Sequence, residues 1–69
     1  MGVKKMVNLQ KLKVGDYISD GTGCYRVTEI KSKVVIAYYE WTNWAGRFSM
    51  RYCISKEDLK TDVWEDYNG

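Results

Sequence analysis

The residues best suited to bind a ligand are aromatic and lie close together in the sequence. Six of the ten aromatic side chains fall between positions 38 and 52, namely Tyr38, Tyr39, Trp41, Trp44, Phe48 and Tyr52. Trp44 follows Asn43 in a predicted loop, where no core pattern requires a large ring. Exposed flat rings can stack on a nucleobase, and each stacked base contributes about 1–3 kcal/mol. The pattern therefore indicates a site for a planar molecule.

Two arginines follow this aromatic segment on the next predicted strand. Arg47 and Arg51 are four positions apart, so strand alternation places both on its outward face. A guanidinium group can bind phosphate through two parallel hydrogen bonds. The combination predicts a nucleotide-like ligand and the following ligand-binding set: Tyr39, Trp41, Asn43, Trp44, Arg47 and Arg51. A protein interface is the competing interpretation, because Trp, Tyr and Arg are also enriched at interface hot spots.

Catalytic and metal-binding residue types are scarce. The chain has no His, which is the commonest general base and the commonest metal ligand. Cys24 and Cys53 stand in no metal-binding or redox spacing, and we expect two reduced thiols. The Gly-rich segment 20–23 is typical of a plain turn, and the carboxylates of residues 57–66 lack the spacing of a calcium loop. We therefore expect a protein that is not an enzyme, with no catalytic residue, no metal ligand and no cofactor.

Short strands separated by turns must position these residues. Residues 13–18 lead into a first strand, and residues 24–31 form a second strand. In the second strand Ile30 is out of phase with Tyr25 and Val27, which predicts a β-bulge near Thr28–Glu29. Residues 34–41 form the strongest strand, apolar on both faces, so both faces should be covered. Residues 42–46 form a hairpin loop.

The next strand shows the clearest alternation. In residues 47–54 the apolar positions Phe48, Met50, Tyr52 and Ile54 are expected to face inward. On the preceding strand, Tyr38 is likewise expected in the core. Residues 55–58 resemble a helix cap that begins one helical turn, with Leu59 docked on the core. Residues 63–64 are then expected to form a short closing strand.

This order of elements predicts a mainly β fold. We expect a small SH3-like barrel or roll of about five strands with one short helical turn near the C-terminus, and an OB-like barrel is the second choice. Residues 1–69 should form a single small β-barrel domain, in which residues 1–8 and 66–69 are flexible. A core this small rarely provides more than about 3–5 kcal/mol of net stability. The aromatic count exceeds what such a core can hide, which predicts a homo-oligomer with its site at the subunit interface.

Charge and hydropathy bear on the partners and the location. The net charge is +2, but residues 1–51 carry +5 and residues 52–69 carry −3. This asymmetry suits either a nucleic-acid surface with an acidic end or two surfaces that meet between subunits. No apolar run approaches the roughly 18 residues that span a bilayer, and the N-terminus lacks a signal-peptide hydrophobic region. We expect a cytoplasmic protein without membrane contact, in the host cytoplasm if it is viral.

Residues 54–67 carry a resemblance to a known group of proteins. Their Ser-x-x-Asp-Leu turn leads into Asp-x-Trp-Glu, and the segment resembles the end of small phage anti-defence proteins, including the anti-Thoeris sponges. The matching positions are Ser55, Asp58, Leu59, Asp62, Trp64 and Glu65. The resemblance implies a compact, mostly β, oligomeric protein that binds a nucleotide-derived immune signal between subunits without cleaving it. It assigns no ligand contact, because the matched residues form a cap and a strand.

A second resemblance concerns the first half of the chain. Residues 12–18 followed by residues 25–30 are similar to the opening of SH3-like and ribosomal-type barrels, some of which bind RNA or DNA. Three functional hypotheses follow. The first is sequestration of a nucleotide-derived signalling molecule, the second is inhibition of a host defence protein by direct contact, and the third is nucleic-acid binding.

Overall fold

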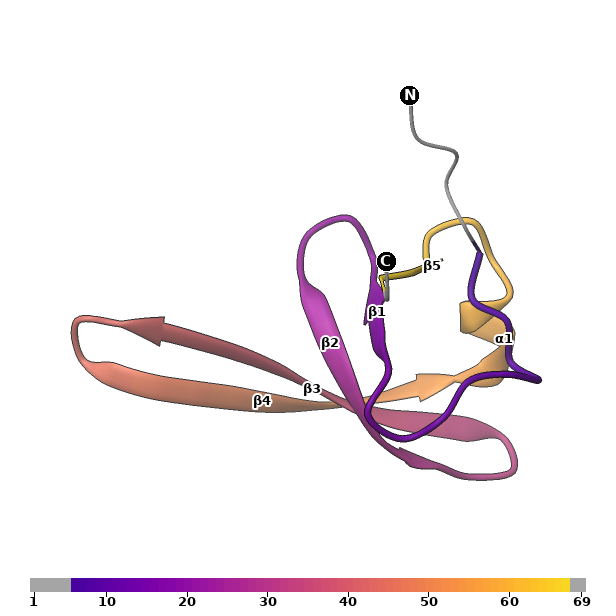
Figure 1. The fold of residues 1–69 in the computed structure, drawn as a ribbon, viewed down its shortest axis with the longest axis horizontal. Coiled ribbons are helices and arrows are strands. Elements are labelled where there is room, and N and C mark those ends of the chain that lie inside the picture. The colour runs from indigo at the N-terminus through magenta and orange to yellow at the C-terminus, as the bar shows by residue number, and fades with distance from the viewer. Residues whose placement is uncertain (1–5, 68–69) are drawn as a thin grey trace.

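The computed structural model describes residues 6–67 and confirms a mainly β fold (Figure 1). Five antiparallel strands form one sheet in the order β4-β3-β2-β1-β5, together with one short helix. The elements are β1 (Tyr17–Ser19), β2 (Cys24–Ile30), β3 (Val34–Asn43), β4 (Gly46–Ser55), α1 (Lys56–Leu59) and β5 (Glu65–Asp66). Strands β1 to β4 follow one another as hairpins, and β5 returns to pair with the far side of β1.

The predicted bulge is confirmed in β2. Val27 lies opposite Ala37, but the next pair joins Glu29 to Ile36, so Thr28 is the additional residue. Its hydroxyl donates a hydrogen bond of 3.4 Å to the Ile36 carbonyl. The extra residue restores the phase of the strand, because Ile30 then lies opposite Val35 and packs against the core. The bulge thus lets one strand follow the sheet without turning its apolar side to water.

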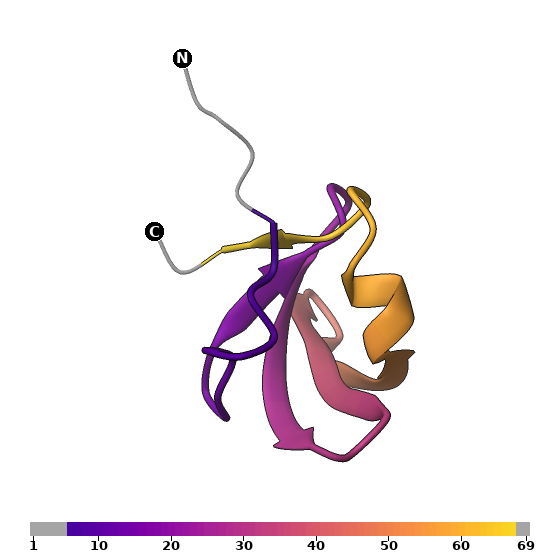
Figure 2. The same ribbon diagram turned by 90° about the vertical axis from the view of Figure 1, so that its right-hand side faces the viewer.

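The core lies between one end of the sheet, α1 and the segment before β1. Its buried members are Val7, Ile18, Tyr25, Val27, Val35, Ala37, Ile54 and Leu59. Figure 2 shows α1 packed beside the sheet, where Leu59 is fully buried. The predicted cap is present, since the Ser55 hydroxyl accepts a 3.1 Å hydrogen bond from the Asp58 N–H. The cap starts the helix at the point that directs Leu59 onto the core.

The β3–β4 hairpin extends well beyond this core (Figure 1). β2 pairs with β3 only as far as Tyr39, so the described sheet has two strands beyond that residue. The expectation that Phe48, Met50 and Tyr52 face the core is therefore wrong. They share the face of buried Ile54, but they are 39%, 49% and 36% exposed because nothing in residues 6–67 covers the part of that face that lies beyond Ile54. Tyr38 is half-buried and also lies outside the core cluster.

The ends of the sheet differ from the expected barrel. β4 and β5 are at opposite ends of the strand order, and no backbone pairing joins them within residues 6–67. Closure into an SH3-like barrel therefore stays a prediction. The closing strand is Glu65–Asp66 rather than 63–64, since Val63 is exposed and the Trp64 ring packs against Tyr25 at 5.4 Å between centroids.

The termini take part in this end of the sheet. Met6 forms a bridge with Glu65, Val7 is buried, and Asp66 pairs with Ile18, although these residues belong to the segments expected to be flexible. The remaining parts of those two segments, residues 1–5 and 68–69, lie outside the described residues.

We predict that Leu59→Ala leaves the chain largely unfolded at 25 °C. Removal of a fully buried leucine costs about 2–5 kcal/mol, which is comparable to the whole net stability of so small a core. Urea unfolding followed by circular dichroism measures the change. Val63→Ala is the matched control, because Val63 is exposed and its loss should change stability by no more than about 0.5 kcal/mol. Equal midpoints for both variants would contradict this placement of the core.

A second prediction concerns the turn between β1 and β2. Partial burial alone would raise the pKa of Asp20, but hydrogen bonds from the Thr22 hydroxyl, the Thr22 N–H and the Tyr25 hydroxyl outweigh it and hold the pKa below 3.8. A carboxylate with a lowered pKa stabilises the fold above its unfolded-state pKa, and that stability is lost as the pH falls through the folded value.

We therefore expect the wild-type protein to lose unfolding free energy as the pH falls from about 5 to below 3.8, and Asp20→Asn to lose less over the same range. Urea unfolding at a series of pH values measures the difference. Glu57→Gln controls for the removal of one negative charge. Parallel curves for wild type and Asp20→Asn would show that the turn does not depend on the ionised carboxylate.

Candidate ligand-binding site

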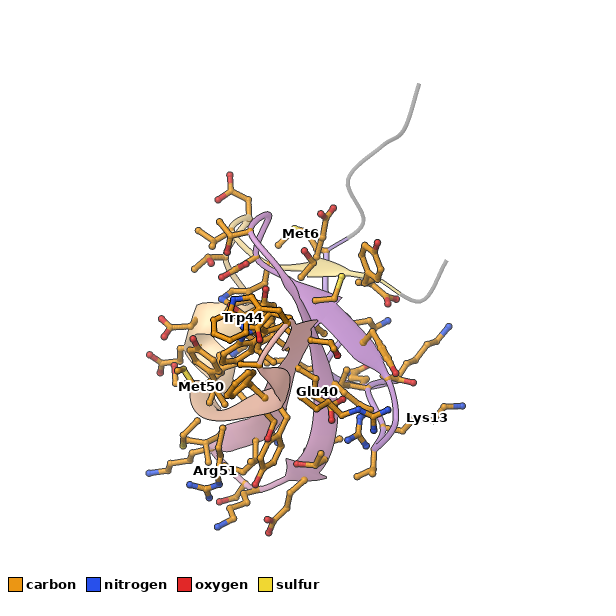
Figure 3. The ribbon with its side chains drawn as sticks, turned by 90° about the vertical axis from the view of Figure 1, so that its left-hand side faces the viewer. Met6, Lys13, Glu40, Trp44, Met50 and Arg51 are labelled. Atoms are coloured by element: carbon orange, nitrogen blue, oxygen red, sulfur yellow. The ribbon has the colours of Figure 1, made fainter. Side chains whose placement is uncertain are left out.

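The register of the β3–β4 hairpin divides the candidate residues between two faces. Tyr39 lies opposite Met50 and Trp41 opposite Phe48, so these residues share the face that continues from the core. Tyr38 lies opposite Arg51 and Thr42 opposite Arg47, on the other face. Figure 3, which views the hairpin from its loop, shows Met50 and Trp44 on one side and Arg51 on the other. We call the first side the aromatic face (Tyr39, Trp41, Phe48, Met50, Tyr52) and the second the arginine face (Tyr17, Arg26, Tyr38, Arg47, Arg51).

The rings of the aromatic face pack on one another. Trp41 stacks with Tyr39 at 5.5 Å and 29°, and with Phe48 at 5.5 Å and 20°. Tyr25 joins this series to the core, edge-on to Tyr52 at 5.0 Å and tilted against Tyr39 at 5.5 Å. Such pairs contribute about 0.5–1.5 kcal/mol beyond the area they bury. The face is therefore a preformed aromatic surface that remains open to solvent.

Gly23 explains how Tyr39 reaches its position. A Cβ atom at residue 23 would lie 2.5 Å from Cε1 of Tyr39, which is closer than real Cβ contacts come. The Tyr39 ring thus lies directly on the backbone between the β1–β2 turn and β2. A glycine in the turn and a tyrosine sixteen positions later are coupled through this contact, which holds the ring beside Trp41.

The arginine face carries a row of alternating rings and guanidinium groups. Tyr17 pairs with Arg26, Arg26 with Tyr38, and Tyr38 with Arg51, so the row crosses β1, β2, β3 and β4 in one line. Adjacent strands are about 4.8 Å apart, and four strands therefore span about 14 Å. Tyr17, Cys24, Arg26, Tyr38 and Glu40 line a shallow hollow on this face. The face thus combines the two side-chain types that nucleotide recognition uses.

One carboxylate partly balances this row. Arg26 Nε lies 3.4 Å from Glu40 Oε1, and the two side chains are 43% and 51% exposed. An ion pair this exposed contributes little to stability and exchanges readily with another anion. Glu40 thus orients Arg26 without closing it to a ligand.

The predicted ligand-binding set is not assembled on one face. Tyr39 and Trp41 belong to the aromatic face, whereas Arg47 and Arg51 lie on the arginine face. Asn43 accepts a 2.8 Å hydrogen bond from the Ala45 N–H and so shapes the hairpin loop. Trp44, beside it, is 97% exposed. The hairpin tip brings Trp41 and Arg47 together with Glu40 and Thr42 around one shallow hollow.

Sequence reasoning missed Tyr17 and Arg26 of the arginine row, and it assigned Tyr38 to the core instead of the ligand-binding set. The outward direction of Arg26 follows from alternation, because its neighbours Tyr25 and Val27 are apolar. What the sequence does not contain is the register between strands, which sets Arg26 beside Tyr38 and Tyr38 beside Arg51. A predicted hairpin loop of known length could have supplied the second of these pairs.

Residues 6–67 hold no group of three or more metal-ligating side chains of the kind that binds an ion. None of the helical structure in that range has the length and apolarity needed to cross a membrane. No protein-family model, curated protein or solved structure matches the chain.

Proposed function

We propose that this chain is a non-enzymatic binding protein that takes up a nucleotide-derived molecule on the arginine face. The observation that carries the proposal is the row Tyr17–Arg26–Tyr38–Arg51 across four strands. A nucleotide-derived molecule alternates flat bases with phosphates. Tyrosine rings suit the bases by stacking, and guanidinium forks suit the phosphates by paired hydrogen bonds.

The chemistry of the face favours binding without turnover. The chain has no His, and general acid–base catalysis most often relies on that residue. Both cysteines are exposed free thiols, and neither has an imidazole to activate it. The biological role that we propose is sequestration of a nucleotide-derived immune signal by a phage-type protein. It is supported by the resemblance of residues 54–67 to phage sponges and by the stacking and phosphate-binding groups described above.

We expect calorimetric titration with a panel of cyclic and linear dinucleotides to reveal a ligand that binds stoichiometrically. Arg51→Ala should weaken its binding about 10- to 100-fold, because hydrogen bonds to a charged group contribute about 1.5–3 kcal/mol. Lys60→Ala removes the same charge from the residue that follows α1 and is the matched control. Trp41→Ala tests the aromatic face and should leave the affinity unchanged. Mass spectrometry should recover the bound molecule intact after denaturation.

Three results would contradict this proposal. No binding by any member of the panel would reject a nucleotide ligand. Recovery of a cleaved molecule would show an enzyme. Binding of oligonucleotides alone, with an affinity that falls steeply as salt is raised, would favour a nucleic-acid-binding sheet, because neutralised phosphates release counterions.

The aromatic face favours a second candidate function, inhibition of a host defence protein by direct contact. Trp41, Phe48 and Trp44 are rings of the kind that anchor protein interfaces, and Trp44 is almost fully exposed. We expect a partner that needs this face and the loop residue Trp44 beside it to be retained by the wild type and by Arg51→Ala, but not by Trp44→Ala, in a pull-down quantified by mass spectrometry. Retention by all three proteins would exclude the hairpin loop as its contact.

A further inference from the structure

β4 presents a long free edge. It is an end strand of the sheet, and no strand within residues 6–67 pairs with its outer side. Positions 46–53 are all exposed, and the strand contains no Pro and no bulge that would block pairing. A ten-residue edge of this kind is a template for another strand.

The hydrogen-bond pattern identifies which backbone groups face outward. Lys56 N–H donates a 2.9 Å bond to the Lys33 carbonyl, and antiparallel pairs alternate between bonded and non-bonded. Even-numbered residues of β4 therefore bond to β3. The N–H and C=O groups of the odd-numbered residues point to the free edge; within the exposed stretch 46–53 these residues are Arg47, Ser49, Arg51 and Cys53.

The far half of the hairpin also needs further strands. Beyond Tyr39 it is a two-stranded ribbon, and an isolated ribbon is at best marginally stable in water. It nevertheless carries Trp41 and Phe48 on one face. A strand added along β4 would convert this ribbon into part of a wider sheet.

We propose that a second copy of this chain pairs along β4 in antiparallel orientation, about a two-fold axis through Met50, so that two five-stranded sheets become one continuous sheet. In this register Arg47 lies opposite Cys53 of the second copy, and Ser49 lies opposite Arg51 of the second copy. All the outward backbone groups of Arg47, Ser49, Arg51 and Cys53 are then paired. This pairing does not depend on a ligand. The ligand class that we infer from it rests on the proposed function.

Charge selects this register over its two neighbours. An axis through Arg51 sets the two Arg51 side chains directly opposite each other, and an axis through Ser49 sets Arg47 opposite Arg51. Like charges directly opposite are destabilising. With the axis at Met50, each arginine instead lies opposite a small uncharged side chain. Glu40 lies across Ser49 from Arg51 of the second copy, on the same face, which gives this register charge complementarity as well.

The aromatic faces of the two copies become continuous. Tyr25 pairs with Tyr39 and Tyr39 with Met50, so the central row runs from Tyr25 to Met50 and returns through the second copy. Phe48 lies opposite Tyr52 of the second copy, in a position where side chains are close. Thioether–aromatic and ring–ring contacts are both favourable. The rings that one chain leaves exposed at its edge thus gain partners.

The hairpin loop also meets a suitable surface. The same register sets Gly46 opposite Ile54 of the second copy, so the loop that carries Trp44 lies near the start of α1 of that copy, where Lys56 is. Lys56 lines a hollow of about 490 Å³ whose other walls include Leu9, Val34 and Lys60. An almost fully exposed tryptophan and an open, partly apolar hollow are therefore brought to one place twice in the dimer.

On the arginine face, the dimer gathers four arginines at the seam, Arg47 and Arg51 from each copy. The two Arg51 residues are diagonal neighbours, about 7–8 Å apart. One phosphate pairs with one guanidinium, so this spacing suits a ligand with at least two phosphate groups. The ligand class we infer for the proposed function is therefore a diphosphate-bearing nucleotide that spans the seam.

A cysteine scan tests the register directly, in a Cys24→Ser, Cys53→Ser background and without ligand. Residues at the axis form a non-bonded pair with Cα atoms about 4.5 Å apart, which suits a disulfide. Met50→Cys should therefore give a covalent dimer on a non-reducing gel. Ser49→Cys and Arg51→Cys are the controls, because each of these residues is a diagonal neighbour of its equivalent in the second copy, with Cα atoms about 7–8 Å apart, which is beyond the usual Cα separation of a disulfide. Equal cross-linking of all three, or none at Met50→Cys, would overturn the proposal.

A charge pair at residue 49 gives a second test by sedimentation equilibrium. Ser49→Glu faces Arg51 of the second copy and should tighten the dimer, whereas Ser49→Arg should weaken it, with about a tenfold difference in dissociation constant. Within one chain the effects have the opposite sign, because Ser49 pairs with Glu40. Folding stability therefore cannot account for the expected order. A monomeric wild type at 100 µM, or the reverse order, would overturn the pairing; loss of nucleotide binding alone would count only against the proposed function.

Discussion

The limiting constraint in this structure is the area of sheet that the rest of the chain can cover. Within residues 6–67, one four-residue helix, the segment before β1 and the Trp64 ring are available to pack against five strands. They bury the end of the sheet around Ile18, Val27 and Val35, and nothing in the described residues remains for the far half of the β3–β4 hairpin. The confinement of the core to one end of the sheet, the open aromatic face and the free edge of β4 all follow from this shortage of covering elements.

Local rules in the sequence were sufficient for most of the fold. Alternation located the strands, the phase error at Ile30 located the bulge at Thr28, and the Ser55 cap located the helix. These features depend on neighbours within a few residues. The extent of the core depends on which distant segment covers which surface, and Phe48, Met50 and Tyr52 show the difference, since their pattern is that of core residues and their environment is solvent.

The candidate site was harder to predict because it depends on register. Alternation within one strand correctly separates Arg47 and Arg51 from Phe48 and Met50. It does not show that Tyr39 and Trp41 lie on the same face as Phe48 and Met50. Nor does it show that Tyr38 and Arg26 lie on the same face as Arg47 and Arg51. Those relations come from the loop that sets β3 against β4 and from the bulge that offsets β2. A site composed of residues from several strands is visible only when all the registers are known.

The return of β5 to β1 has a consequence for the order of folding. Strands β1 to β4 pair with their neighbours in sequence, whereas the pairing of β1 with β5 joins Ile18 to Asp66, forty-eight positions later in the chain. Local hairpins close quickly, and long loops close late because more chain entropy is lost before any contact forms. A chain made from its N-terminus can thus assemble four strands while Ile18 and Tyr25 still lack the segments that shield them. During that interval its most apolar surface is open to chaperones and to other nascent chains.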